Sequence, residues 1–283
     1  MTTSAATDHA TDGVYLVRAA GAKPVKVISG LQGPLGLVWR ARTLYVASIG
    51  RVDAYSGLKG TRFATRRTVL SEPVGHGWNQ DLVSAPNGRL IMSIASACDH
   101  CTTTSRYSGS IISFDPRGAN VKTYVSRIRA VFGLAFYPGT STLFASMNQR
   151  DDLGAKTPGD ALAVVRAGQD WRFPGCYDQG GSACSGVPAV LATLDKHAAA
   201  GGVAIATGQL GSAIGTAALI PEWELGKVLA VSLTAHGSGY TGGRPTTVLT
   251  GFKSPLPVTI APGRTLLVGD WTTGRIYRIT ASH

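Results

Sequence analysis

One phrase recurs along the chain: a short apolar run, a polar turn and a second apolar run. Its five copies begin at Gly36, Asp81, Gly133, Gly202 and Leu256. In most copies a third apolar run follows and opens on a glycine, as at Gly50, Gly109 and Gly274. A repeat of roughly 40–50 residues made only of short strands is typical of a β-propeller. The pattern therefore predicts an all-β protein whose inner strands surround a channel, with a site built by loops at one end.

The two ends of the chain each read as part of a sheet. Residues 13–17 and 24–28 form two apolar runs with no inner-strand phrase before them, and residues 257–279 supply inner strands without an outer one. A propeller closes by pairing such halves, which removes an exposed sheet edge. We expect residues 1–12 to be a disordered tail and residues 13–283 to be one propeller domain closed by its N- and C-terminal strands.

Composition narrows the class of protein. The 283 residues include 36 glycines and only 15% charged residues, which suits many tight turns and buried strands. The net charge of +11 favours either a soluble basic surface or an anionic partner. A nucleic-acid partner is not expected, because the sequence contains no recognised nucleic-acid-binding module; its densest basic cluster is Arg62, Arg66 and Arg67. No apolar stretch is long enough to span a membrane.

Four cysteines form two local pairs, Cys98 with Cys101 and Cys176 with Cys184. One CxxC alone does not make a zinc site, and this one follows a strand rather than opening a redox-active helix. Two loop-closing disulfides are the favoured interpretation, with a reduced cytoplasmic protein as the alternative. The disulfides would indicate a secreted or periplasmic protein, although the chain does not begin with a signal peptide.

Three successive repeats place a basic side chain just before the inner strand. These are His76, Arg129 and His197. A histidine at a channel mouth could act as a general base, and an arginine could bind a carboxylate. Taken singly, each is as well explained by a loop hydrogen bond or a surface ion pair. Their shared position in the repeat points to a common site.

The loop after the third copy carries candidate metal ligands. Asn148, Gln149, Asp151 and Asp152 could hold Ca²⁺ through oxygen atoms, although a turn-capping pair of aspartates explains them as well. Residues 237–242 match GxGxxG, but Arg244 and Pro245 lead into another strand. A dinucleotide fingerprint needs a helix at that place, so this match carries no cofactor prediction.

Taken together and in order, these motifs resemble the glucose/sorbosone dehydrogenase family, over roughly residues 30–280 and closest to its sorbosone branch. The resemblance rests on His76-Gly77-Trp78, residues 86–90, Ser96 to Cys101, Arg129 with residues 133–138, Asn148 with residues 150–154, Pro158, Asp160 and Leu162, residues 174–177, His197 with Gly201, residues 235–238 and residues 274–279.

The resemblance implies a six-bladed propeller, whereas five repeats can be counted, so five blades is the alternative. It implies pyrroloquinoline quinone (PQQ) and Ca²⁺ as cofactors, a sugar or related aldehyde or alcohol as substrate, and an external electron acceptor. His76 would be the catalytic base, and Arg129 would lie beside the quinone carbonyls. His197, His236 and Arg244 would join Arg129 in binding the quinone, and residues 148–152 would lie near the metal.

Two departures keep other functions open. The family often has an acid before its catalytic histidine and an asparagine after its arginine, where this chain has Gly75 and Ala130. The runner-up interpretation is a non-catalytic propeller that binds carbohydrate or protein. A Ca²⁺-dependent lactonase on the same architecture is a lesser alternative, because the acids cluster in one loop instead of coming from several blades.

Overall fold

The fold is described from a computed structural model, which describes residues 1–3, 10–71, 79–102, 105–177, 182–237 and 239–280. It is an all-β protein with the β-propeller fold expected from the sequence. The described helices are two single turns of 3₁₀ helix, Gly154–Lys156 and Ser182–Cys184. None of the described helices has the length and apolar character needed to cross a membrane. The chain divides into two compact units, Met1–Ile128 and Arg129–His283, and each is described by itself.

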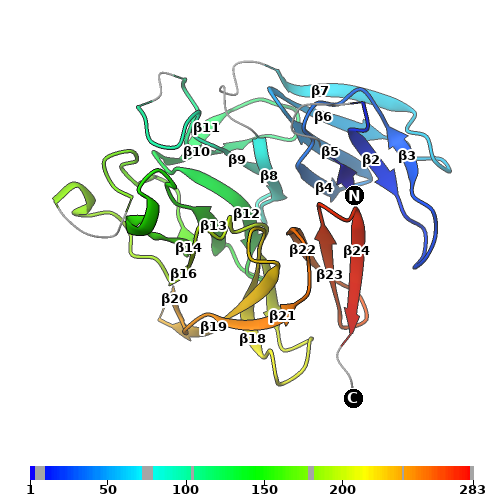
Figure 1. Ribbon diagram of the computed structural model, residues 1–283. Helices are drawn as coiled ribbons and strands as arrows, with labels where there is room; N and C mark the ends of the chain where they lie inside the picture. The colour runs from blue at the N-terminus through cyan, green and yellow to red at the C-terminus, as the bar shows by residue number, and fades with distance from the viewer. Residues whose placement is uncertain (4–9, 72–78, 103–104, 178–181, 238, 281–283) are drawn as a thin grey trace. The chain divides into compact units, whose positions relative to one another are not determined.

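Unit 1 holds two four-stranded antiparallel meanders and one smaller sheet (Figure 1). The first meander is β4 (Gly36–Arg40), β5 (Thr43–Ser48), β6 (Arg51–Ser56) and β7 (Thr65–Ser71), and the second is β8 (Asn79–Ser84), β9 (Leu90–Ile94), β10 (Ser110–Phe114) and β11 (Lys122–Ser126). The smaller sheet is β1 (Thr2–Thr3), β2 (Gly13–Leu16) and β3 (Val25–Ile28). Asp12, in the segment expected to be a tail, is buried and accepts a hydrogen bond from Gly33 N at 2.7 Å.

Unit 2 contains three further sheets (Figure 1). The first is β12 (Ala130–Phe136), β13 (Leu143–Asn148), β14 (Gly159–Val165) and β16 (Ala192–Lys196), and the second is β17 (Ala204–Thr207), β18 (Thr216–Glu222), β19 (Lys227–His236), β20 (Gly239–Gly242) and β21 (Thr246–Thr250). The third is β22 (Pro255–Ala261), β23 (Thr265–Asp270) and β24 (Arg275–Thr280). The two-residue strand β15 is Gln169–Asp170.

The five repeats read from the sequence correspond to five of these sheets, and β1–β3 form a sixth that carries no copy. The fourth repeat, which begins at Gly202, was assigned wrongly. Its second run, at Gly226–Ala230, is the start of the third strand, β19, because β18 lies between. Strand β18 ends on Pro221 and Glu222, residue types that strands disfavour. For this reason the sequence pattern did not identify β18 as a strand. Pairing of the N- and C-terminal strands to close one domain stays a prediction.

Glycines within the inner strands set how closely neighbouring sheets approach. A β-carbon at Gly133 on β12 would lie 2.4 Å from Val203 N, and one at Gly36 on β4 would lie 2.9 Å from the Cβ of Leu82. These distances are shorter than a van der Waals contact, so the backbones can pack this closely only without a side chain. The glycines of the repeated phrase are therefore packing positions between inner strands.

Candidate functional site

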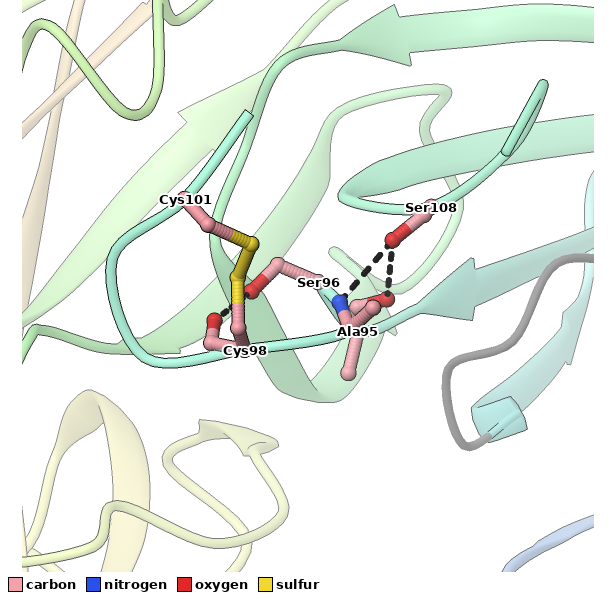
Figure 2. The surroundings of a disulfide bond; sticks show 6 residues. Ala95, Ser96, Cys98, Cys101 and Ser108 are labelled. Carbon is pink, nitrogen blue, oxygen red and sulfur yellow. Dashed lines mark hydrogen bonds between the residues drawn. A yellow bond between two sulfur atoms is a disulfide. The ribbon is translucent and has the colours of Figure 1, made fainter. Parts of the chain in front are cut away.

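Both predicted cysteine pairs form disulfides. Cys98 bonds to Cys101 in the loop after β9, and Cys176 bonds to Cys184 in the loop between β15 and β16. Figure 2 shows how the first is held: Ser96 Oγ donates to the carbonyl of Cys98, and Ala97 N donates to Ser108 Oγ at 3.0 Å. The two disulfides brace two long loops, one after β9 and one between β15 and β16.

The sequence placed His76 and Arg129 together as catalytic residues. His76 lies outside the described residues, so its role stays a prediction. Arg129 directly precedes β12, and its Nη1 donates to the backbone carbonyl of Asn148 at 2.9 Å. The pairing of Ala130 with Asn148 in the β12–β13 ladder brings these two residues together. Arg129 is half-buried, and its position before β12 places it at the end of the sheet.

Asn148 carries an unsatisfied side-chain oxygen. Its Oδ1 is buried and has no hydrogen-bond partner among the described residues. A buried amide oxygen without a partner costs free energy, roughly 1–3 kcal/mol. Such an atom is suited to accept a hydrogen bond from a ligand or to coordinate a hard cation. Among the four residues predicted to bind a metal, Asn148 has a buried side-chain oxygen without a partner in the described part of the chain.

The neighbouring acids in this loop are engaged in ion pairs. Asp151 Oδ1 lies 3.0 Å from His197 Nδ1, and the other ring nitrogen of His197 lies 3.0 Å from the carbonyl of Gly154. Asp152 accepts two hydrogen bonds from Arg150, at 2.6 Å from Nε and 2.5 Å from Nη2. The described residues include no group of three or more His, Cys, Asp or Glu side chains placed to bind one metal ion. These contacts fix the loop against the residue that follows β16.

Asp160, near the start of β14, makes hydrogen bonds to two different segments of the site. It is 3% exposed, and its two carboxylate oxygens accept hydrogen bonds from Gln149 N and Ala200 N, each at 2.8 Å. Burial raises the pKa of this carboxyl to about 6, against the opposing effect of those two amides. The charge of Asp151 raises the pKa further, whereas that of Arg129 lowers it. Asp160 thus contacts both the loop after β13, through Gln149, and the segment after β16, through Ala200.

A second buried acid lies on the adjacent sheet. Glu222, at the end of β18, is fully buried, and its Oε1 accepts a hydrogen bond from Asp195 N at 3.2 Å. Lys227 Nζ lies 2.6 Å from Asp195 Oδ2 and 3.3 Å from Glu222 Oε2. Burial, and then the Asp195 carboxylate, raise the pKa of Glu222 to about 7, while the hydrogen bond from Lys227 lowers the pKa of Asp195.

Not all the predicted cofactor-binding residues converge. Arg129, Asn148, Gln149 and His197 gather at the end of the β12–β16 sheet that contains Asp160. His236 ends β19, a strand of ten residues whose opposite end holds Lys227 beside Asp195. Arg244 is exposed between β20 and β21, alongside the middle of β19. The structure therefore separates His236 and Arg244 from the Asp160 end within unit 2.

Sequence reasoning did not assign a site role to Asp160 or Glu222. Each interrupts or ends an otherwise apolar strand, GDALAVV for β14 and TAALIPE for β18. An acid within such a run is the one available signal, because a buried carboxylate needs a specific partner. The partner of Asp160 across the sheet boundary, Ala200 N, is 40 residues away and could not be read from the sequence.

The chain shares its fold with a class of solved sugar oxidoreductases. No protein-family model matches it, and no curated protein matches its sequence. The PQQ-bound aldose sugar dehydrogenase from Streptomyces coelicolor is 20% identical, with a TM-score of 0.76 over 95% of this chain and 87% of that one. A calcium structure of a Trichoderma reesei enzyme of carbohydrate-active enzyme family AA12 is 15% identical, with a TM-score of 0.77 over 96% and 87%.

A third structure is the apo-form of the soluble aldose sugar dehydrogenase from Escherichia coli, which is 15% identical with a TM-score of 0.71 over 90% of this chain and 86% of that one. The fold is thus that of PQQ sugar dehydrogenase-like propellers, as the motif resemblance implied. At these identities the likeness establishes the fold, while function depends on the site.

Proposed function

We propose that this protein is a PQQ- and Ca²⁺-dependent dehydrogenase that oxidises a sugar or a related aldehyde or alcohol. The observation that carries the proposal is the arrangement around Asp160. A half-buried arginine, a buried amide oxygen without a partner and a histidine all lie at one end of one sheet. The propeller fold, shared with a PQQ-bound sugar dehydrogenase, supports the same reaction class.

The available groups suit the proposed cofactor. PQQ is an anion with carboxylates and adjacent carbonyls, so its binding needs cationic hydrogen-bond donors. Arg129 offers such a donor, and Asn148 Oδ1 offers an oxygen ligand of the kind that Ca²⁺ prefers. Asp151 and Asp152 already pair with His197 and Arg150, so we assign them to positioning the loop. Bound PQQ would supply the acceptor for the two electrons released when the substrate's C–H bond is oxidised.

The chain's own residues would handle charge and protons. Arg129 would hold the negative charge that develops on the acceptor, because a guanidinium stays protonated at all working pH values. His76 would take the proton of the substrate hydroxyl as general base. The electrons would then leave to an external acceptor. The two disulfides support a secreted or periplasmic location, and a sorbosone-type substrate is part of this proposal.

The test is dye reduction by the purified chain with PQQ, Ca²⁺ and a panel of aldoses. Arg129→Ala should lower kcat/KM at least tenfold. Arg166→Ala is the matched control, since Arg166 is exposed just after the other end of β14. His76→Ala should abolish turnover yet keep quinone binding. Absence of both quinone binding and turnover with every aldose would refute the proposal.

A non-catalytic propeller that binds carbohydrate or protein is the second candidate. It is favoured by the contacts at the site, where Arg129 already donates to a backbone carbonyl and both loop aspartates are in ion pairs. The departures at Gly75 and Ala130 point the same way. Under this candidate, a His76→Ala protein would bind its partner like the wild type, and the quinone would have no effect on thermal stability.

A further inference from the structure

A hollow in unit 1 combines positive charge with aromatic side chains. It lies between β3 and the β6–β7 hairpin and has a volume of about 400 Å³. We call it the Arg62 hollow; its lining includes Ile28, Tyr55, Arg62, Phe63 and Arg66. This volume falls within the range of roughly 300–1,000 Å³ found for small-molecule sites. The first 128 residues also carry most of the chain's excess positive charge.

The charge at the hollow is only partly neutralised. Asp53 is fully buried and accepts hydrogen bonds from Arg51 at 2.9 Å and from Arg66 at 3.0 Å. One carboxylate thus faces two guanidinium groups. Arg62 adds a third at the rim, exposed and in no ion pair among the described residues. An incoming carboxylate would therefore meet a net positive field and the forked donors of Arg62.

Aromatic rings continue from the hollow onto the surface. The ring centroids of Tyr55 and Phe63 are 5.7 Å apart, and those of Phe63 and Trp39 are 6.5 Å apart. Trp39 on β4 is 53% exposed, although tryptophan is usually well buried. The exposed indole of Trp39 offers an apolar, flat face, and the ring of Phe63 lies beside it, tilted by 48°. The C–H face of a pyranose ring fits such a surface, whereas a free inorganic anion gains nothing from it.

The floor of the hollow adds a polar group. Tyr55 is 5% exposed, and its Oη makes no hydrogen bond with normal geometry to any described residue. Burial raises the pKa of this phenol, and the nearby Asp53 carboxylate raises it further. The hydroxyl therefore stays a neutral donor at physiological pH. Because this hydroxyl is itself buried, the exposed donor that an entering carboxylate meets is Arg62.

We propose that the Arg62 hollow binds a uronate residue of an acidic oligosaccharide, with the carboxylate at Arg62 and the sugar ring against Phe63 and Trp39. The hollow shares no residue with the group around Asp160, which belongs to unit 2. It would hold the protein on an acidic polysaccharide without taking part in oxidation. The combination of arginine and aromatic rings selects an acidic sugar over a neutral sugar or a bare anion.

The test is isothermal titration of the full chain with trigalacturonate, using maltotriose as the neutral match, without PQQ or Ca²⁺. We expect saturable binding of trigalacturonate, at least tenfold tighter than maltotriose and weakened by added salt. Arg62→Gln should weaken trigalacturonate binding about tenfold. Trp39→Ala should weaken it to a similar extent, with the fold of each variant checked by its melting temperature.

Arg117→Gln is the matched control, because Arg117 is exposed in the same unit and does not line the hollow. Its affinity should equal that of the wild type. The proposal is overturned if trigalacturonate does not bind, if Arg62→Gln leaves the affinity unchanged, or if inorganic phosphate competes at equal concentration. Since no cofactor is present, failure here leaves the proposed dehydrogenase activity untouched, and failure of that activity leaves this binding untouched.

Discussion

Two equivalent sheets, β4–β7 in unit 1 and β12–β16 in unit 2, each bury one aspartate near the start of the third strand. Asp53 on β6 is surrounded by cations and by Thr68, whose hydroxyl donates at 3.0 Å. Asp160 on β14 receives only backbone amides, and burial raises its pKa to about 6. Asp53 is the third residue of its strand and Asp160 is the second. A buried aspartate near the start of a third strand therefore serves charge pairing in one sheet and a proton-sensitive site in the other.

The partners of Asp53 lie on strands β6 and β7, whereas the second sheet differs from the first by a long loop. In the first sheet, short turns join β4 to β5 and β5 to β6. In the second, the loop from Gln149 to Pro158 joins β13 to β14, and its backbone reaches Asp160. Long loops on a rigid sheet are where function is usually added. The proposed active site is thus built by a long loop at one end of a four-stranded sheet.

Replacing the inner-strand glycine should give the largest effect in either sheet. Gly133→Ala would place a β-carbon 2.4 Å from Val203 N, a backbone atom that has little room to move. We expect a loss of about 3 kcal/mol or more in the free energy of unfolding. Gly36→Ala should cost less, because its nearest contacts are at 2.9 Å. Urea unfolding of both variants measures this, and equal losses would contradict the packing account.

The pH dependence of stability should follow the buried acids of unit 2. A raised pKa in the fold means that the neutral form is favoured there. Stability is then complete below the unfolded pKa near 4 and declines as the pH rises through about 6 for Asp160 and about 7 for Glu222. The loss for Asp160 should be about 2–3 kcal/mol.

Urea unfolding measured from pH 4 to pH 8 tests this, with Asp160→Asn and Glu222→Gln as the variants. Each should flatten part of the decline, because an amide does not ionise. Two results would contradict this account: a wild-type free energy of unfolding that rises from pH 4 to pH 8, or a decline that neither variant alters. Either would show that burial does not penalise the charged form of these carboxyls.

A smaller effect separates the two aspartates directly. Asp53→Asn removes the partner of Arg51 and Arg66, and should cost about 2 kcal/mol at pH 5. Asp160→Asn should cost about 1 kcal/mol at the same pH, because the native carboxyl is then mostly protonated and one acceptor remains. Thermal unfolding gives both values. A larger loss for Asp160→Asn would reverse the assigned roles.

The sequence was informative wherever local pattern decides structure. Apolar runs and glycines predicted the propeller, and cysteine spacing predicted both disulfides. The common position of His76, Arg129 and His197 in the repeat predicted a shared site, which stays a prediction; the structure places Arg129 and His197 at one end of the β12–β16 sheet. Burial of Asp160 and Glu222 could not be predicted, because it depends on amides and side chains supplied by other strands. His236 lies elsewhere because β19 is longer than the repeat suggests.

The central claim is that the Asp160 end of the β12–β16 sheet is a quinone site. It is tested most directly by equilibrium titration of the purified chain with PQQ, followed by absorbance, with and without Ca²⁺. The account predicts saturable binding of one PQQ per chain that is weakened by removal of Ca²⁺ and at least tenfold by Arg129→Ala, with Arg166→Ala unchanged. No saturable binding, or equal affinity in the Arg129→Ala protein, would contradict it.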